Sequence, residues 1–391
     1  MDDVVIAGAC RSPIGGFLGS LSALPAPRLG AVVIQEALRR AGVSPGDVQE
    51  VIMGNVITAG VGQAPARQAA LFAGLPQSTE CLTVNKVCGS GLKAVMLAAQ
   101  AIRAGDADVV VAGGMESMSN APFLLDKARA GLRMGNTELA DALVKDGLLD
   151  VYHNYLMGNA GELCASECAV PRQAQDDFAI LSYRRAQEAQ RSGAFKAEIV
   201  PVEIKGRKGD TLRVTEDEDV RKAVFEKIPA LKPAFIPDGT ITAANSSKIS
   251  DGAAAMVVLS ATRARELNVK PQATLVGQAS YAKAPEWFTT APADVIEKLL
   301  RKTGRTREEI DLFEINEAFA VVALAVNKIA GLDVAKVNIH GGAIALGHPI
   351  GASGARVLVT LLYALERRNL HRGLAALCIG GGEASGVIIE R

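Results

Sequence analysis

Apolar and polar residues alternate along the chain with two different periods, and the switch between these periods predicts an α/β protein. Short apolar runs at residues 4–9, 51–53 and 109–112 have the length and composition of strands buried on both faces. In residues 28–42, apolar positions recur at helical spacing and stop at Gly42, which is typical of a helix end. Strand–helix alternation of this kind predicts a parallel sheet.

The stretch 85–92 lies between a β-prone run and a long apolar helix predicted over residues 92–102. Cys88 stands just before that helix and is followed by glycine. Free N–H groups and the positive dipole end of a helix favour the thiolate form, which is the form that attacks acyl groups. Because most free cysteines are buried packing residues, a catalytic interpretation of Cys88 depends on other parts of the chain.

The pattern changes in residues 119–249. Helices are predicted at residues 138–144 and 172–191, and a charge-dense stretch follows in which residues 205–210 have the composition of a solvated turn between strands. We expect this region to be inserted between two buried α/β halves and to cover a substrate.

The last third of the chain repeats the first. Residues 42–54 align without gaps on residues 304–316. The helix that begins at Ser90 and the strand after it have a counterpart beginning at Ser353, with a five-residue insertion expected at residues 368–373. A duplication predicts two similar halves related by a pseudo-twofold axis, with one active site between them.

The two halves differ where chemistry is expected. In place of Cys88 the second half has Gly351, shortly after His348 in a glycine-rich turn. An imidazole there can deprotonate a cysteine and then lie beside developing negative charge. The chain has four histidines, and the other three are expected at the surface or in the core: His153, His340 and His371.

Two further polar groups occupy ends of predicted strands. Asn316 follows the strand predicted at residues 312–315 and precedes a helix predicted from residue 317, so its amide can hold a water or hydroxyl in an oxyanion site. Cys378 ends the last strand and is followed by the glycines at 380–382, whose N–H groups can donate. Carboxyl ends of parallel strands meet at one crevice, so these groups are expected to gather there.

The totals exclude several classes of function. Hydrophobic residues make up 49% of the 391, and the 42 basic residues balance 42 acidic ones, so neither nucleic acid nor an anionic membrane is an expected partner. Six cysteines in so long a chain do not predict a disulfide framework, and Cys164 and Cys168 are expected to pack rather than to bind metal. The first residues carry no leader pattern, so we expect a cytoplasmic protein.

Five motifs together resemble the signatures of the thiolase family, in the family's order and spacing. They are CGSG at 88–91, GGMESMS at 113–119, NEAFA at 316–320, GHPIGASG at 347–354 and CIGGG at 378–382. The resemblance covers essentially the whole chain and is nearest to the biosynthetic acetoacetyl-CoA thiolases.

The resemblance implies a five-layered αβαβα thiolase-like fold built from two similar halves. The implied domains are residues 1–118 with 250–268, a loop domain at 119–249 that covers coenzyme A, and residues 269–391. The implied reaction is the reversible condensation of two acetyl-CoA to acetoacetyl-CoA and coenzyme A. Coenzyme A is then substrate and product, no cofactor or metal is expected, and the expected assembly is a homotetramer or a homodimer.

The resemblance also implies roles for individual residues. Cys88 carries the acetyl group, His348 activates it, and Cys378 is the acid/base at the substrate α-carbon. Asn316 holds a water that forms one oxyanion hole with His348, while the N–H groups of Cys88 and Gly380 form the other. The implied coenzyme A-binding residues are Leu148, Met157, Arg221, Phe235, Ser247, Ala318 and Phe319.

One departure from the family leaves the acyl chain open. The family usually has histidine before Met157-Gly158, where this chain has Leu156. A 3-ketoacyl-CoA thiolase of broader chain length is therefore the alternative function. A carrier-protein ketoacyl synthase is disfavoured because it needs a second histidine, and a silent coenzyme A-binding scaffold is disfavoured because every reactive side chain is present.

Overall fold

Strands from both ends of the chain form the central sheet. The computed structural model describes residues 2–206 and 209–391. The strands of the first half are β1 (Val4–Arg11), β2 (Gly15–Gly16), β3 (Glu50–Gly54), β4 (Glu80–Val84), β5 (Val109–Ser117) and β12 (Ser250–Ser260). Those of the second half are β13 (Ala273–Ala282), β14 (Leu312–Ile315), β15 (Arg372–Ile379) and β16 (Glu383–Glu390). In the described part of the chain they form a ten-stranded sheet in the order β4-β3-β5-β12-β1-β13-β16-β15-β14, with β2 paired to β12.

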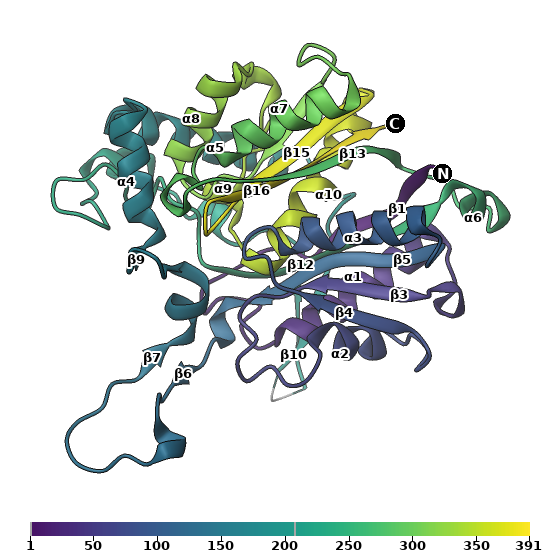
Figure 1. Ribbon diagram of the computed structural model, residues 1–391, viewed down its shortest axis with the longest axis horizontal. Coiled ribbons are helices and arrows are strands. Elements are labelled where there is room, and N and C mark those ends of the chain that lie inside the picture. The colour runs from purple at the N-terminus through teal and green to yellow at the C-terminus, as the bar shows by residue number, and fades with distance from the viewer. Residues whose placement is uncertain (1, 207–208) are drawn as a thin grey trace.

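The helices form layers on both sides of each half-sheet and between them. They are α1 (Ala26–Ala41), α2 (Pro65–Phe72), α3 (Ser90–Ala104), α6 (Ala261–Glu266), α7 (Ala291–Thr303), α8 (Ala320–Ala330), α9 (Ala343–Leu346) and α10 (Ile350–Arg368). Figure 1 shows α1 and α2 on the outer face of the first half, α7 and α8 on the outer face of the second, and α3 with α10 between the halves. These are the five layers, α, β, α, β and α. Among the described helices, none is both long and apolar enough to cross a membrane.

Strand β1 shows why the buried runs are continuously apolar. Val5 and Ala7 belong to the core under α1 and α2, whereas Val4 and Ile6 belong to the core around α3 and α10. Because side chains of a strand alternate between its faces, residues 4–9, which pack against helices on both faces, are all apolar or glycine.

The two halves have the same plan, as the repeat predicts. From the centre outwards, the order β1-β12-β5-β3 in the first half matches β13-β16-β15-β14 in the second. Helices α1 and α7 occupy equivalent places and both end at a glycine with positive φ, 69° at Gly42 and 65° at Gly304. The alignment of residues 42–54 with 304–316 is therefore confirmed by the topology.

The expectation of a parallel sheet is only partly correct. β3 is parallel to β4 and β5, and β14 is parallel to β15, but β12, β1, β13 and β16 pair with their neighbours in antiparallel fashion. The reason lies in the connections. The glycine turn at 380–382 joins β15 to β16 as a hairpin, which reverses the chain without a crossover helix.

The insertion expected at residues 368–373 is absent. Strands β5 and β15 each begin nineteen residues after the matching serine, from Ser90 to Val109 and from Ser353 to Arg372. Gly113 and Gly114 lie inside β5, whereas the glycines at 381–382 form a turn, so these glycine pairs are not equivalent. The two glycine pairs have the same sequence but different structural roles, so aligning one on the other wrongly indicates an insertion.

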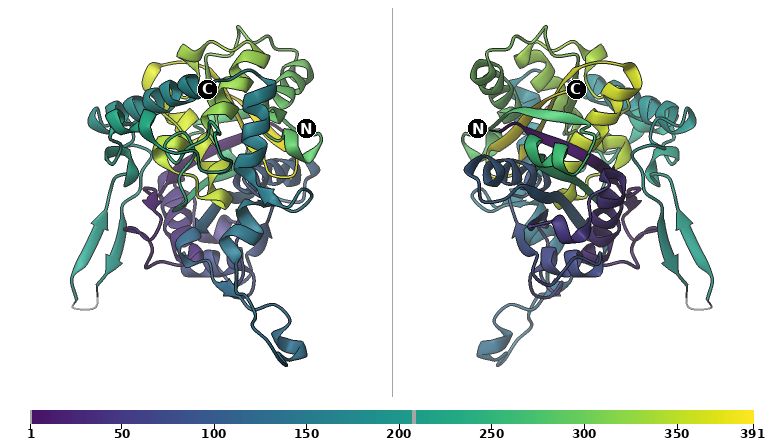
Figure 2. Two further views of the ribbon diagram at one scale, coloured as in Figure 1. Left: turned by 90° about the vertical axis from the view of Figure 1, so that its left-hand side faces the viewer. Right: turned by 90° about the vertical axis from the view of Figure 1, so that its right-hand side faces the viewer.

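The middle of the chain, residues 119–249, contains two long helices and short hairpins. The helices are α4 (Met157–Glu167) and α5 (Arg172–Arg191), and the second has the bounds predicted from sequence. The short strands are β6 (Phe123–Leu124), β7 (Ala140–Asp141), β8 (Leu149–Asp150), β9 (Tyr155–Leu156), β10 (Val202–Lys205) and β11 (Thr211–Val214). Figure 2 shows that the β6–β7 segment and the β10–β11 hairpin project from the body.

The helix predicted at residues 138–144 is wrong. That segment contains β7, which pairs with β6 at the base of a projecting arm, and a π-helical turn at Val144–Leu148 follows it. Pairing across the arm replaces the helical hydrogen bonds that the spacing alone suggested. The solvated turn predicted at residues 205–210 joins β10 to β11, and its residues 207–208 lie outside the described residues.

Candidate active site

Cys88 lies in a tight turn between the end of β4 and the start of α3. Val87, directly before it, has φ +46°, a left-handed conformation that is unfavourable for a β-branched residue. The Ser90 hydroxyl holds the turn, because it accepts a hydrogen bond from the Lys86 N–H (2.8 Å) and donates one to the Val87 carbonyl (2.6 Å). The strained backbone thus fixes Cys88 at the edge of the sheet.

The Cys88 thiol is neutral in this environment. Burial raises its pKa to about 11, although the backbone N–H groups of Gly380 and of Cys88 itself lower that pKa. The thiolate expected from the helix N-terminus is therefore wrong, because desolvation of the charge outweighs the donors. The same two N–H groups are available to an oxygen that becomes negative during reaction.

Cys378 belongs to the other half and lies close to Cys88. It is fully buried in β15. Burial raises the pKa of Cys378 well above its ordinary value, a negative charge on Cys88 raises it further, and the N–H groups of Cys378 and Ala318 lower it. Two thiols from opposite halves therefore share one site.

His348 presents a neutral imidazole with a free Nε2. The Ser353 hydroxyl donates to the Pro349 carbonyl (2.9 Å), so it accepts the hydrogen of His348 Nδ1 at 2.5 Å. Nε2 is then an acceptor, and the Asn316 amide nitrogen lies 3.5 Å from it. Burial, together with the charge of Arg356, lowers the pKa of His348 to about 3. The imidazole is therefore neutral, and the lone pair on its Nε2 can accept a proton.

Asn316 carries an unused acceptor as well as its donor. Its side-chain oxygen is buried and has no hydrogen-bond partner among residues 2–206 and 209–391. Its backbone N–H donates to the Ala376 carbonyl at 3.0 Å, which fixes it beside β15. An unsatisfied buried amide oxygen suits a site that receives a water or a substrate group.

Two local expectations about these residues are wrong. Helix α8 begins at Ala320 rather than after Asn316, because the intervening residues pair with the inserted region: the Ala318 carbonyl accepts the Ser247 N–H (2.9 Å), and the Ala320 N–H donates to the Asn245 carbonyl (2.8 Å). As the repeat's equivalent of the Cys88 turn, the glycine-rich turn of His348 is expected to follow a strand. It follows the short helix α9 instead. In the second half the counterpart of β4 is reduced to a single bridge between Phe313 and Val337.

Glu116 is a site residue that the sequence analysis missed. It is fully buried and accepts hydrogen bonds from the Asn55 amide (2.7 Å), the Val56 N–H (3.0 Å) and the Gly351 N–H (2.8 Å). Burial raises its pKa to about 7. Because Gly351 lies in the first turn of α10, Glu116 connects the end of β5 to the helix that follows His348. The motif at 113–119 contains Glu116, but no pattern in the sequence indicates that it bonds to Gly351.

A cavity of about 240 Å³ leads to His348. Of the predicted coenzyme A-binding residues, it is lined by Leu148, Met157, Phe235, Ser247 and Phe319. The Phe235 and Phe319 rings meet edge to face, with centroids 5.9 Å apart. Leu156 and Ile350 also line this cavity. Ile350 belongs to an apolar cluster against which Cys88 packs. Ala318 does not line the cavity, since its backbone serves Cys378 and Ser247 instead.

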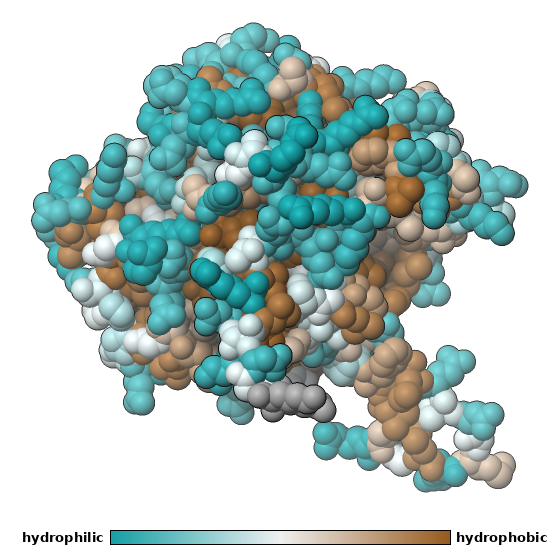
Figure 3. All heavy atoms as spheres, turned by 180° about the vertical axis from the view of Figure 1, so that it is seen from behind, coloured by the Kyte–Doolittle hydropathy of each residue, from teal (hydrophilic) through white to brown (hydrophobic). Residues whose placement is uncertain are grey.

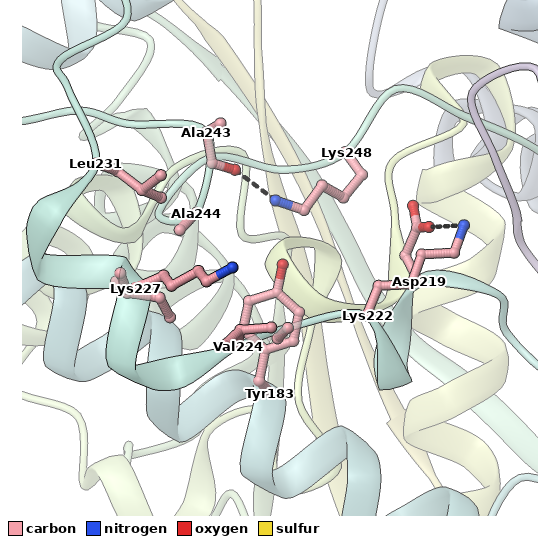
Figure 4. Close-up of a pocket in the computed structure, with 11 residues that line it drawn as sticks. Tyr183, Asp219, Lys222, Val224, Lys227, Leu231, Ala243, Ala244 and Lys248 are labelled. Carbon is pink, nitrogen blue, oxygen red and sulfur yellow. Dashed lines mark hydrogen bonds and ion pairs between the residues drawn. The ribbon is translucent and has the colours of Figure 1, made fainter.

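Figure 4 shows a second cavity, of about 400 Å³. It lies between α5 and the loops at 219–231 and 243–248, and Lys248 lines both cavities. Arg221, predicted near the nucleotide, is not among its liners. Its guanidinium pairs with Glu216 at 2.9 Å and is largely exposed.

Comparison with known proteins identifies the family. The family model for the thiolase N-terminal domain matches residues 4–262, and that for the thiolase C-terminal domain matches residues 269–391. The chain belongs to the thiolase family and has the thiolase fold, and it is an acyltransferase.

Individual relatives are similar over their full length. An acetyl-CoA acetyltransferase from Cupriavidus necator is 54% identical over 392 residues, covering 100% of both chains. The crystal structure of the Bacillus anthracis acetyl-CoA acetyltransferase matches with TM-score 0.98 and 41% identity, covering 100% of this chain and 99% of that one. A thiolase from Ascaris suum, solved in complex with coenzyme A, matches with TM-score 0.95 and 45% identity over 100% of both chains.

Proposed function

We propose that this protein is an acetyl-CoA C-acetyltransferase, which condenses two acetyl-CoA to acetoacetyl-CoA and coenzyme A and also catalyses the reverse reaction. The observation that carries the proposal is the pair of thiols: Cys88 from the first half, with two N–H donors directed at it, lies beside Cys378 from the second. Condensation needs one group to hold an acyl chain and another to remove a proton, and this pair supplies both.

In the first stage the acetyl group moves to Cys88. The thiol proton passes to His348 Nε2 as the sulfur attacks the thioester carbon, and the carbon–sulfur bond to coenzyme A breaks. Because both groups are neutral beforehand, proton transfer and attack occur together rather than through a preformed ion pair. The departing coenzyme A sulfur takes up the proton of the Cys378 thiol, so Cys378 is left as the thiolate and Cys88 as the acetyl-cysteine.

In the second stage a new carbon–carbon bond forms. A second acetyl-CoA loses a proton from its α-carbon to Cys378, reacting as the thiolate, and the resulting carbanion attacks the acetyl carbon on Cys88. The Cys88 sulfur leaves and takes back its proton from His348, and acetoacetyl-CoA is released. The N–H groups of Cys88 and Gly380 stabilise the oxyanion on the acetyl group, and a water held by Asn316 and His348 stabilises the enolate oxygen.

Coenzyme A occupies the two adjoining cavities in this proposal, with its nucleotide in the larger and its pantetheine arm in the smaller. Residues 119–249 act as the loop domain that covers it, between an N-terminal domain (1–118 with 250–268) and a C-terminal domain (269–391). The chemistry requires both cysteines as thiols. All six cysteines of the chain are free, which supports action in a reducing, cytoplasmic compartment.

A broader acyl-chain range is the second candidate function. Leu156, 37% exposed, lines the smaller cavity with an apolar side chain. Such a wall tolerates longer acyl groups better than a polar one does. We expect acetoacetyl-CoA to be the best or nearly the best substrate, with some thiolysis of C6 or longer 3-ketoacyl-CoA.

Two measurements test the proposed function. After brief exposure to acetyl-CoA, the peptide containing Cys88 should gain the mass of one acetyl group, while that containing Cys378 should not. Rates of thiolysis across 3-ketoacyl-CoA chain lengths then decide the substrate. Strong activity on long chains with none on acetoacetyl-CoA would replace the acetyltransferase by the broader thiolase.

The active form is proposed to be a homotetramer, or a homodimer. The arm at residues 123–141 supports this, because it projects from the body and carries exposed apolar side chains (Figure 3). They are Phe123, Leu125, Leu132, Met134 and Leu139. A second copy of the chain is the partner that can cover such an arm. Shortening the arm should lower the number of chains in each assembly, which light scattering measures.

A further inference from the structure

Lys248 lies where the two cavities adjoin, and its two ends face different cavities. Its backbone carbonyl accepts the His348 N–H at 3.0 Å, on the catalytic side. Its ammonium donates to the Ala243 carbonyl and lies 5.7 Å from the centre of the Tyr183 ring. Ala243 and Tyr183 both line the larger cavity (Figure 4), so the charge of Lys248 belongs to that cavity.

The charge on Lys248 is poorly compensated. Burial lowers the pKa of Lys248, and the carboxylate with an opposing influence is Asp219. Asp219 is itself paired with Lys222 at 2.8 Å. A partly buried ammonium that bonds to a carbonyl instead of a carboxylate retains most of its attraction for an anion.

The rest of the larger cavity fits a nucleotide carrying phosphate. Apolar and aromatic side chains form most of its wall, among them Tyr183, Val224 and Leu231. Three lysines line it, Lys222, Lys227 and Lys248, against the single carboxylate Asp219. The excess of positive charge inside an apolar wall favours an anionic group attached to an apolar or ring-containing molecule.

We propose that Lys248 binds a phosphate oxygen of coenzyme A at the junction with the pantetheine arm, exchanging its bond to the neutral Ala243 carbonyl for an ion pair. This inference rests on the proposed function, since it assumes that coenzyme A runs through both cavities. The ammonium lies beside Ala243 and Tyr183, which line the larger cavity, so Lys248 recognises the carrier portion of the substrate rather than its acyl group. Lys248 is a binding and positioning residue and takes no part in proton transfer.

The test compares three probes that share the pantetheine arm. Affinities of coenzyme A, 4′-phosphopantetheine and pantetheine are measured by calorimetry for the full-length protein and for Lys248→Met and Lys248→Arg. Loss of a hydrogen bond to a charged group weakens binding by about tenfold or more. Lys248→Met should therefore weaken binding of coenzyme A and 4′-phosphopantetheine by about tenfold or more, and that of pantetheine much less. Lys248→Arg should restore most of the affinity.

Lys298→Met is the matched control. The Lys298 ammonium also bonds a backbone carbonyl, that of Ser280 at 2.8 Å, but it lies on α7 and lines neither cavity. It should leave all three affinities unchanged. Equal weakening of the three probes by Lys248→Met would assign Lys248 to the pantetheine arm and overturn the phosphate contact, as would no weakening of coenzyme A. Failure of the unaltered protein to bind coenzyme A at all would instead refute the proposed function.

Discussion

The two halves of the molecule share one plan but contribute different chemistry. Each has an outer helix that ends at a glycine, a strand that leads to the site, a buried helix that begins there, and a strand that returns to it. The first half places Cys88 immediately before its buried helix, α3. The second half places Gly351 at the equivalent position in α10 and supplies His348, Asn316 and Cys378 around it.

Equivalent positions in the two halves are never both reactive. Asn316 in the second half corresponds to Gly54 in the first, and Cys378 corresponds to Met115, which is wholly buried in the outer core. Space explains the glycine. A side chain on Gly54 would begin 2.6 Å from the Gly351 carbonyl oxygen. Where one half carries a functional side chain, the equivalent position in the other half carries a glycine or an apolar residue. The molecule therefore has one site rather than two.

The largest expected effect comes from removing the nucleophile of the first half. Cys88→Ser leaves a hydroxyl that His348 cannot activate comparably, so both condensation and thiolysis should fall by about 10⁴-fold or more. Steady-state rates measure the loss, and an unchanged circular dichroism spectrum is the control for folding. Retention of more than a tenth of the activity would remove Cys88 from the chemistry.

Restoring a side chain to the vacant position of the second half tests the packing argument. A Cβ on Gly351 would lie 2.6 Å from Glu116 Oε2 and 3.0 Å from the Met115 carbonyl oxygen. Gly351→Ala should therefore lower the free energy of unfolding by about 3 kcal/mol, measured by denaturant titration. Gly46→Ala is the control, because open space surrounds Gly46. It should change stability by no more than about 0.5 kcal/mol.

The pH at which the Cys88 thiol ionises shows whether burial or the helix N-terminus has the larger effect on its pKa. With a pKa of about 11, roughly one thiol in a thousand is ionised at pH 8. Alkylation of Cys88 by iodoacetamide should thus accelerate about tenfold per pH unit from pH 6 to 9. A plateau near pH 7 would show that a thiolate–imidazolium pair exists before substrate arrives.

The smallest expected effect concerns the residue that orients the base of the second half. Ser353→Ala removes the acceptor of the His348 Nδ1 hydrogen, so the imidazole loses its fixed tautomer and orientation. Acetylation of Cys88 should slow by about tenfold. Removal of the α-carbon proton, which depends on Cys378, serves as the comparison. An equal loss in the rates of acetylation and of this proton transfer would indicate a general structural effect.

The sequence predicts the elements of this fold better than their connections. Hydrophobic period and the end at Gly42 predict α1, and hydrophobic period alone predicts α5, β1 and β14, because those signals are local. The antiparallel pairing of β12 and β16 depends on which distant strand lies alongside, and no local pattern encodes that choice. Likewise, the helix predicted at residues 138–144 follows a helical spacing that cross-arm pairing with β6 overrides.

The same limit applies to the site. Motif and position single out Cys88, His348, Asn316 and Cys378 as candidates. The structure places Asn316 against His348 and Cys378 close to Cys88. Glu116 and Ser353 act through hydrogen bonds to Gly351 and His348, and such partners become visible only in three dimensions. The ionisation of Cys88 was misjudged for a similar reason, since the depth of burial depends on packing from both halves.

The central claim is that the first half holds the acyl group while the second moves the proton at the substrate α-carbon, and Cys378→Ser tests it most directly. Two rates are measured on this variant: condensation of acetyl-CoA, and exchange of the acetyl group between acetyl-CoA and labelled coenzyme A. Exchange requires only the acetylation of Cys88, which His348 and the N–H donors support. Cys378 serves there to protonate a coenzyme A sulfur that can also leave as the thiolate. Condensation should fall by about 10²–10⁴-fold while exchange is reduced far less. A fall of both rates by the same factor would contradict the division of labour between the halves.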